Sequence, residues 1–502
     1  MNNRRAWLLI FVLAALTAPT WFYPYFPRFD SGAYLMGIES LANGRLPRVL
    51  SHPLQPPATY PPVAMFLLAP VYALFRGSDA ALRAALSLVW LLAMGIFFAA
   101  QRRDEDAGRL PWALALAGTG SVWLYCGRIQ SEIPYLALTI AALACVTRLK
   151  RDERFFGGLW GPATFALAAL VPLTRQIGLM FVAGAAVYLV WDRRRWKRGL
   201  ALALLVLVIG GAPAATLYSV TQPKQFSPTQ STVLHRNGWD PNQGHLSLLS
   251  RELLGRVKMN IVDSAELAPA SLFVLDFAPR PMWARAAMWL LCALMAAGVV
   301  VRFARGPTGV EFYLLCYLAL LLVTPWLVET RFYTVLAPWL ALYLIDGAQW
   351  LGRIALRRED RARIFSYALV AAMIAINLLS IARYDFRDRW SRRGNDEARM
   401  FAWGATMLGP GDVVLTSDPF AFYVLYRRYA LSYTMSEQKY QPRYRLEAYL
   451  AGGGRADAIL FPTTDQEVVA NSLVHFGLAM NQPQRSPEGW TFARLARARG
   501  AP

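Results

Sequence analysis

Two acidic residues lie beside apolar segments, where a carboxylate could do chemistry. Asp30 stands in Phe-Asp-Ser-Gly-Ala-Tyr, just past the first apolar segment, and Glu132 opens a later one directly after Ser131. An ionised carboxylate at a membrane surface is costly unless it has a partner or a function. Two such groups on one face of a membrane could hold an acceptor hydroxyl and take its proton, or bind a cation.

Each acid also has a simpler interpretation as a helix cap. Asp30 precedes Leu35, Ile38 and Leu41, which recur at helical spacing, and Glu132 suits the first turn of a helix. The two roles are compatible. The start of a helix holds a carboxylate rigidly and leaves backbone N–H groups free for an anion.

Two arginines are candidates for contact with phosphate. Arg331 opens an apolar segment, and Arg175 lies in Leu-Thr-Arg-Gln between two others. A guanidinium can bind phosphate through two parallel hydrogen bonds. Alternatively, Arg331 extends into the lipid headgroups, and Arg175 pairs with Asp30 or Glu132. Pro338 is predicted to kink the helix that Arg331 opens.

The composition is that of a membrane protein with several spans. Of 502 residues, 56% are hydrophobic and 17% are charged, whereas charged residues make up about a quarter of an average soluble protein. The net charge of +20 comes from short basic runs between apolar segments. Such runs are typical of cytoplasmic loops, so nucleic-acid binding is not predicted.

Several kinds of site are not indicated. The four cysteines show no close pairing and the four histidines no ligand-like spacing. Neither a disulfide framework nor a metal site is therefore predicted, no cofactor is expected, and a divalent cation has no support. Walker, dinucleotide-binding and Gly-x-Ser-x-Gly motifs do not occur in the strand context that they require. This pattern excludes cytosolic nucleotides as reactants.

About eleven segments are long and apolar enough to cross a membrane. They are 6–22, 80–100, 110–126, 132–148, 157–173, 176–191, 199–219, 284–303, 310–328, 331–350 and 364–382. The first is predicted to be an uncleaved span that starts in the cytoplasm. A further stretch, 60–75, contains three prolines and is predicted to lie along the outer surface. With this choice, every dense basic cluster faces the cytoplasm.

The resulting topology predicts two parts. Residues 1–382 form the membrane part, with outer loops at 23–79 and 220–283. Asp30, Glu132, Arg175 and Arg331 then share the extracytoplasmic side. Everything after residue 382 lies there too.

The stretch 383–502 is predicted to be a small extracytoplasmic α/β domain. Short apolar runs there alternate with helical patterns and turn signals. Strands are predicted at 413–415, 458–461 and 490–493, and helices at 420–426, 444–450 and 464–476.

In this order and topology the chain resembles the GT-C superfamily of polytopic glycosyltransferases. It is similar to the protein O-mannosyltransferase and aminoarabinose (lipid A) transferase group, which is glycosyltransferase family 39-like. The resemblance covers about residues 1–380. It rests on an ordered set of motifs: Asp30 in the first outer loop, Tyr60-Pro61-Pro62, Ser131-Glu132, Leu173-Thr174-Arg175, and Arg331-Phe332-Tyr333 with Pro338.

The resemblance implies an inverting transfer of a sugar from a polyprenyl-phosphate donor to an acceptor hydroxyl outside the cytoplasm. It implies that Asp30 is the base or the carboxylate that orients the acceptor. Glu132 would be the second outer acid, and Arg331, with Arg175, would bind the donor phosphate.

The chain departs from the family pattern at two places. The second outer acid is frequently aspartate in the family and is glutamate here. A lysine that some relatives place near the Pro-Pro segment is missing, and Arg76 is a candidate stand-in. Further side chains predicted to contact substrate are Tyr34, Tyr60, His52, Glu329 and Tyr333.

Two other functions stay open at this point: a transporter or flippase for a glycolipid, and a non-catalytic membrane scaffold. The predicted partners of a transferase are the lipid-linked donor, a lipid, glycan or protein acceptor, and membrane lipids. The absence of Asn-x-Ser/Thr sequons and the Ala/Arg/Leu-rich composition favour a bacterial inner membrane.

Overall fold

The computed structural model describes residues 27, 30–58, 60–100, 120–152, 154, 156, 158–191, 195–221, 245–273, 281–323, 330–383, 396–433 and 445–497. The predicted span at 6–22, most of the one at 110–126, and Glu329 lie outside these residues.

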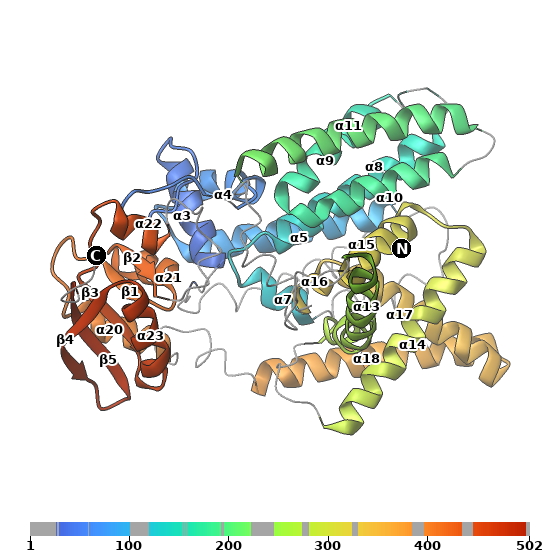
Figure 1. Cartoon of the computed structure of the whole chain (residues 1–502). Coiled ribbons are helices and arrows are strands. Elements are labelled where there is room, and N and C mark those ends of the chain that lie inside the picture. The colour runs from blue at the N-terminus through green and yellow to red at the C-terminus, as the bar shows by residue number, and fades with distance from the viewer. Residues whose placement is uncertain are drawn as a thin grey trace.

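The part of the chain before residue 384 is helical (Figure 1). Its elements are α3 (Asp30–Ala42), α4 (Val63–Leu74), α5 (Asp79–Ala100), α7 (Gly120–Cys126), α8 (Glu132–Arg151), α9 (Trp160–Thr174), η1 (Gln176–Gly178), α10 (Leu179–Val190), α11 (Trp196–Thr221), α13 (His245–Ala270), α14 (Met282–Arg305), α15 (Gly309–Val323), α16 (Thr330–Thr334), α17 (Ala337–Leu356) and α18 (Glu359–Arg383).

Five of these helices, α5, α8, α11, α14 and α18, are long and apolar enough to cross a membrane. Each overlaps a predicted span. Four shorter apolar stretches correspond to α4, α9, η1 with α10, and α15. A helical membrane part is thus confirmed, while the number of about eleven spans stays a prediction.

The outer loop at 23–79 holds two short helices, α3 and α4. With 12 residues, α4 is about 18 Å long, well short of the roughly 30 Å hydrocarbon core. Helix α10 is equally short, so the surface position of 60–75 stays a prediction. Pro70 lies inside α4 and removes one backbone donor.

Two junctions between helices matter for the site. Arg175 is an extended residue, with φ −152° and ψ 140°, between α9 and η1. At the other junction the prediction of one kinked helix over 331–350 is wrong. Helix α16 ends at Thr334 and α17 begins at Ala337. Pro338 lies in the first turn of α17, where its missing N–H costs nothing.

The connector 220–283 contains a helix that the sequence reading missed. Helix α13 has 26 residues. The Asn260 side chain on α13 donates hydrogen bonds to the carbonyls of Leu321 and Leu322, both at 3.0 Å. The charged residues spread through α13 interrupt its apolar pattern, so no span was predicted there. The helix nevertheless packs against α14 and α15.

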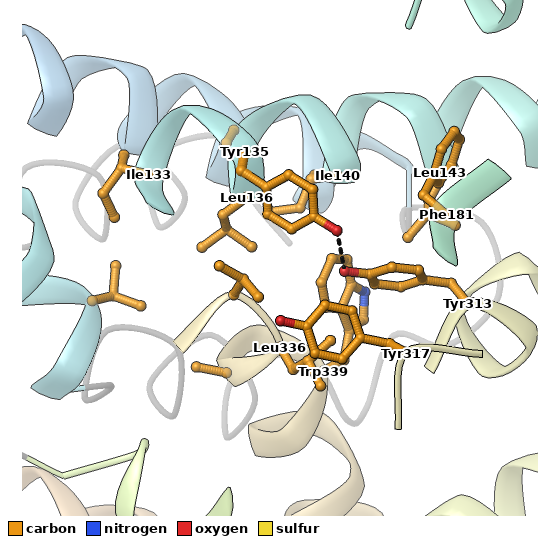
Figure 2. Packing of buried hydrophobic residues seen from close by; sticks show 14 of the residues in the cluster. Ile133, Tyr135, Leu136, Ile140, Leu143, Phe181, Tyr313, Tyr317, Leu336 and Trp339 are labelled. Atoms are coloured by element: carbon orange, nitrogen blue, oxygen red, sulfur yellow. Dashed lines mark hydrogen bonds between the residues drawn. The ribbon is translucent and has the colours of Figure 1, made fainter. Parts of the chain in front are cut away.

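An aromatic core joins α8, α15 and α17 (Figure 2). The Tyr135 and Tyr313 hydroxyls are hydrogen-bonded at 3.0 Å. The Tyr313 ring meets Tyr317 and Trp339 edge-on, with centroids 5.6 and 5.7 Å apart. Tyr317 donates a 2.7 Å hydrogen bond to the carbonyl of Phe332, next to Arg331. This core therefore fixes both the helix that begins with Glu132 and the helix that carries Arg331.

The last part of the chain forms a five-stranded sheet between helices (Figure 1), which confirms the predicted small α/β fold. Its elements are α20 (Asp396–Ala405), β1 (Val414–Thr416), α21 (Pro419–Tyr426), β2 (Ala430–Ser432), α22 (Leu446–Ala451), β3 (Ala458–Pro462), η4 (Thr463–Asp465), α23 (Gln466–His475), β4 (Leu478–Arg485) and β5 (Trp490–Arg497). The sequence reading missed α20, β2 and β4.

The strand order is β2-β1-β3-β5-β4, with β2, β1 and β3 parallel and β5 antiparallel to both neighbours. Alternate residues of the strands face opposite sides. Val414 and Leu460 pack in a cluster with α20 and α21, whereas Leu415 and Ile459 pack in one with α22 and α23. Helices therefore cover both faces of the sheet.

Candidate functional site

Asp30 and Arg331 form an ion pair between the first turn of α3 and helix α16. Arg331 Nη1 donates to Asp30 Oδ2 at 2.8 Å. The two side chains are 28% and 29% exposed. The pair is therefore partly accessible to solvent.

Tyr60 holds the other oxygen of Asp30. Its hydroxyl donates to Asp30 Oδ1 at 3.0 Å. Burial, reinforced by the negative charge of Asp30 and the hydrogen bond to it, holds the pKa of Tyr60 well above its usual value. The phenol therefore stays protonated and keeps donating. Both carboxylate oxygens of Asp30 are positioned by side chains from other segments.

Glu132 and Arg175 form a second, more deeply buried pair. Arg175 Nη1 lies 2.5 Å from Glu132 Oε1, with side-chain exposures of 16% for the arginine and 4% for the glutamate. The same nitrogen donates to the Ser131 hydroxyl at 3.3 Å. Burial would lower the pKa of Arg175, but the adjacent Glu132 outweighs it and the pKa is raised. Arg175 therefore stays charged beside Glu132.

The second oxygen of Glu132 has no hydrogen-bond partner among the described residues, although it is buried. A buried carboxylate oxygen in that state is costly. This oxygen lies close to Arg175 and accepts no hydrogen bond from the described part of the chain.

Tyr34 lies between the two pairs. Its ring meets that of Tyr60 edge-on, with the centroids 5.5 Å apart. Burial raises its pKa; Arg175 and a hydrogen bond with Ser131 act in the opposite direction, while Glu132 and Asp30 add to the increase. One connected polar cluster thus runs from Arg331 through Asp30, Tyr60 and Tyr34 to Arg175.

Three other predicted site residues lie in different surroundings. Arg76 is exposed in the turn after α4, where its φ is +50°. His52 is buried; its Nδ1 accepts from the Leu54 N–H at 3.0 Å, and its ring meets Tyr449 edge-on. The Tyr333 hydroxyl donates to Ser264 at 2.5 Å, and the ring is buried.

The structure adds residues that the sequence reading did not assign to the site. Ser131 contacts Arg175, and Tyr317 holds the backbone beside Arg331. Ser131 was visible only as a cap before Glu132. Tyr317 sits within an apolar segment, where a tyrosine gives no signal of its long-range partner. Within the described residues no group of three or more His, Cys, Asp or Glu side chains could hold a metal ion.

Comparison with known proteins places the fold. No protein-family model and no curated protein matches the sequence. Among solved structures, ArnT from Cupriavidus metallidurans bound to undecaprenyl phosphate is similar, with a TM-score of 0.50, 16% identity and 98% of each chain covered. The apo state of that protein gives a TM-score of 0.46 at 14% identity, again over 98% of each chain.

The described part of the chain therefore belongs to the class of membrane proteins built mainly of helices. Within this class, the arrangement is similar to that of ArnT along nearly the whole chain. At this level of identity the likeness concerns the fold alone.

Proposed function

We propose that the protein is a membrane glycosyltransferase that moves a sugar from a polyprenyl-phosphate donor to an acceptor hydroxyl. The observation that carries the proposal is the partly exposed Asp30–Arg331 pair, which places a carboxylate and a guanidinium 2.8 Å apart. ArnT, which has a similar fold, was solved bound to undecaprenyl phosphate. A lipid-linked phosphate needs a cation at headgroup depth, and a hydroxyl nucleophile needs a carboxylate facing water.

In this mechanism the donor phosphate competes with Asp30 for Arg331. A phosphate offers the guanidinium the same bidentate geometry as a carboxylate, with more negative charge. Arg331 shifts toward the phosphate, and Asp30 accepts a hydrogen bond from the acceptor hydroxyl instead. Donor binding thereby prepares the base.

The transfer then follows as an inverting displacement. The acceptor oxygen forms a bond to the anomeric carbon, and the bond from that carbon to the phosphate oxygen breaks. The electron pair leaves with the polyprenyl phosphate, where Arg331 stabilises the charge, and the hydroxyl proton passes to Asp30. Tyr60 keeps the carboxylate in position by its hydrogen bond.

We assign the buried pair a supporting role. Glu132 is nearly inaccessible at 4% exposure, so we place it behind Arg175 rather than against the acceptor. Arg175 adds positive charge beside Tyr34 and thereby favours the phosphate. Arg76, His52, Tyr333 and Glu329 are not required by this mechanism.

The orientation belongs to the same proposal. The basic connectors face the cytoplasm. The Asp30–Arg331 pair and the five-stranded sheet face the opposite side. We place the protein in a bacterial inner membrane, with its N-terminus in the cytoplasm.

The direct test is release of free polyprenyl phosphate from a polyprenyl-phosphate sugar by the purified protein in lipid nanodiscs. Arg331→Gln is expected to lower this release about 100-fold and to weaken binding of the polyprenyl phosphate at least tenfold, because both the charge and the fork are lost. The release by Arg331→Lys should lie between those of wild type and Arg331→Gln, since lysine keeps the charge but not the two parallel donors. Arg285→Gln is the matched control, because that arginine pairs with Glu266 and is 53% exposed. Equal donor binding by wild type and Arg331→Gln would remove the phosphate role.

Tyr60→Phe tests the positioning of the carboxylate. The variant keeps the ring against Tyr34 and loses only the hydrogen bond to Asp30. A hydrogen bond to a charged group contributes about 1.5–3 kcal/mol, so we expect the turnover number to drop about tenfold with little change in thermal stability. Tyr367→Phe, at an exposed position on α18, should match wild type. Full activity of Tyr60→Phe would show that Arg331 alone positions Asp30.

A further inference from the structure

Helix α21 of the C-terminal part lies along α3, the helix that begins with Asp30 (Figure 1). Gly32 faces Phe420, and Glu39 pairs with Arg427 at 2.5 Å. The two contacts are seven residues apart along each segment, close to two helical turns, and Arg427 is the residue directly after α21. The helices therefore run parallel, with their N-terminal ends side by side next to Asp30.

The contact at Gly32 leaves no space for a side chain. A Cβ atom at this position would lie 2.7 Å from Phe420 Cβ, 3.0 Å from the Phe420 carbonyl carbon and 3.2 Å from the Ala421 nitrogen. The backbone of α21 thus rests directly on the first turn of α3. The Asp418 side chain caps α21 by accepting from the Ala421 N–H at 3.1 Å, which fixes this end of the helix.

Phe420 also packs in the cluster that Tyr60, the hydrogen-bond donor to Asp30, contacts. Its side chain is 1% exposed and lies in a cluster with Ala33, Met36 and Leu50, against which Tyr60 is packed. One residue of the C-terminal part therefore touches both the helix that carries Asp30 and the surroundings of its hydrogen-bond donor.

Other contacts join the two parts farther from the carboxylate. The Ala430 N–H donates to the Ser51 carbonyl at 2.8 Å, and the rings of His52 and Tyr449 meet edge-on. The Arg427–Glu39 pair lies toward the other end of the two helices, with Arg427 50% exposed. These contacts attach the C-terminal part, whereas the Phe420 contact lies at the turn that starts with Asp30.

We propose that Phe420 is a positioning residue for the transfer reaction, which holds the first turn of α3 and the ring of Tyr60 so that Asp30 keeps its productive geometry. The inference rests on the proposed function. It assigns the C-terminal part a direct effect on the chemical step. A displacement of about 1 Å at a reacting group can reduce a rate about 100-fold, so loss of this contact should affect turnover more than binding.

The first test compares Phe420→Ala with Phe420→Leu in the full-length protein. We expect Phe420→Ala to lower kcat at least tenfold while the affinity for polyprenyl phosphate stays within twofold of wild type. Phe420→Leu should recover most of the activity, because it refills the buried volume. Arg427→Ala, at the far end of the same interface, should keep at least half of the wild-type kcat.

The second test approaches the contact from α3. Gly32→Ala should lower kcat about tenfold, since the added methyl group pushes on the α21 backbone. Gly37→Ala is the matched control on the same helix, because the atoms nearest its methyl group belong to the flexible side chain of Met65 and not to a backbone. Both substitutions change helix propensity equally. A similar loss in both would show a general effect on α3 and overturn the inference.

The outcomes separate the two proposals. If wild type releases no polyprenyl phosphate, the proposed function fails. If wild type is active and Phe420→Ala matches it, the positioning role alone fails. The role also fails if Phe420→Ala loses donor binding and kcat in parallel with its folded fraction.

Discussion

Replacing Asp30 with asparagine is expected to lower sugar transfer about 1,000-fold, within the usual range for loss of a general base. Asparagine has the same size, but its single carbonyl oxygen can accept from only one of Tyr60 and Arg331, and its amide cannot take a proton. The lost ion pair is partly exposed, at 28% and 29%, so the cost to stability should stay near or below about 1 kcal/mol. Release of polyprenyl phosphate and thermal unfolding of the same preparation measure the two effects.

Asp79→Asn is the matched control for this experiment. Asp79 also lies in the first turn of a helix, α5, and is outside the polar cluster. The variant tests whether a helix-start acid matters for folding without touching the chemistry. If Asp30→Asn turns over at the wild-type rate, Asp30 is only a cap and the transfer must use another base.

The second large effect concerns stability. Arg175→Met is expected to lower the free energy of unfolding by about 3–5 kcal/mol, because it leaves Glu132 charged, buried and without its partner. Glu132 is 4% exposed, and its second oxygen already lacks a hydrogen bond among the described residues. Unfolding of the purified protein in mixed micelles, followed by tryptophan fluorescence, gives the measurement.

The double variant Arg175→Met with Glu132→Gln separates charge from packing. Removing both charges should recover more than half of the lost stability, because no buried charge then remains uncompensated. Arg363→Met breaks a half-exposed pair with Glu359 and should cost about 0–1 kcal/mol. A double variant no more stable than Arg175→Met would show that the guanidinium acts through packing, not through Glu132.

The two arginines are thus expected to give opposite profiles. Arg331 belongs to the open pair, so its loss should reduce donor binding and turnover while the fold survives. Arg175 belongs to the buried pair with Glu132, so its loss should mainly reduce the stability of the fold. The assay also separates a transferase from a flippase, since a flippase moves the glycolipid without breaking the bond between sugar and phosphate.

Local sequence patterns determined much of the fold. Long apolar stretches predicted α5, α8, α11, α14 and α18, because hydrocarbon requires continuous apolar helices. The short apolar runs at 413–415, 458–461 and 490–493 predicted β1, β3 and β5. Prolines marked α4 as a short helix. In each case the signal lies within the element itself.

Elements without a strong local signal escaped prediction. The charged residues of α13 masked its helical pattern, and β2 is only three residues long. Pro338 was expected to kink one helix, but the chain breaks there into α16 and α17. Proline disfavours a helix interior and suits a helix start equally well, and neighbouring helices decide which applies.

The sequence alone identified Asp30, Glu132, Arg175 and Arg331 as unusual charges and left their pairing open. Tertiary structure decided that Arg175 pairs with Glu132, that Arg331 pairs with Asp30, and that Tyr60 donates to Asp30. It also placed α21 on Gly32. Whether a residue is buried or caps a helix depends largely on the residues next to it in the sequence. Which charge meets which depends on how α3, α8 and α16 pack around the aromatic core, and no local pattern encodes that packing.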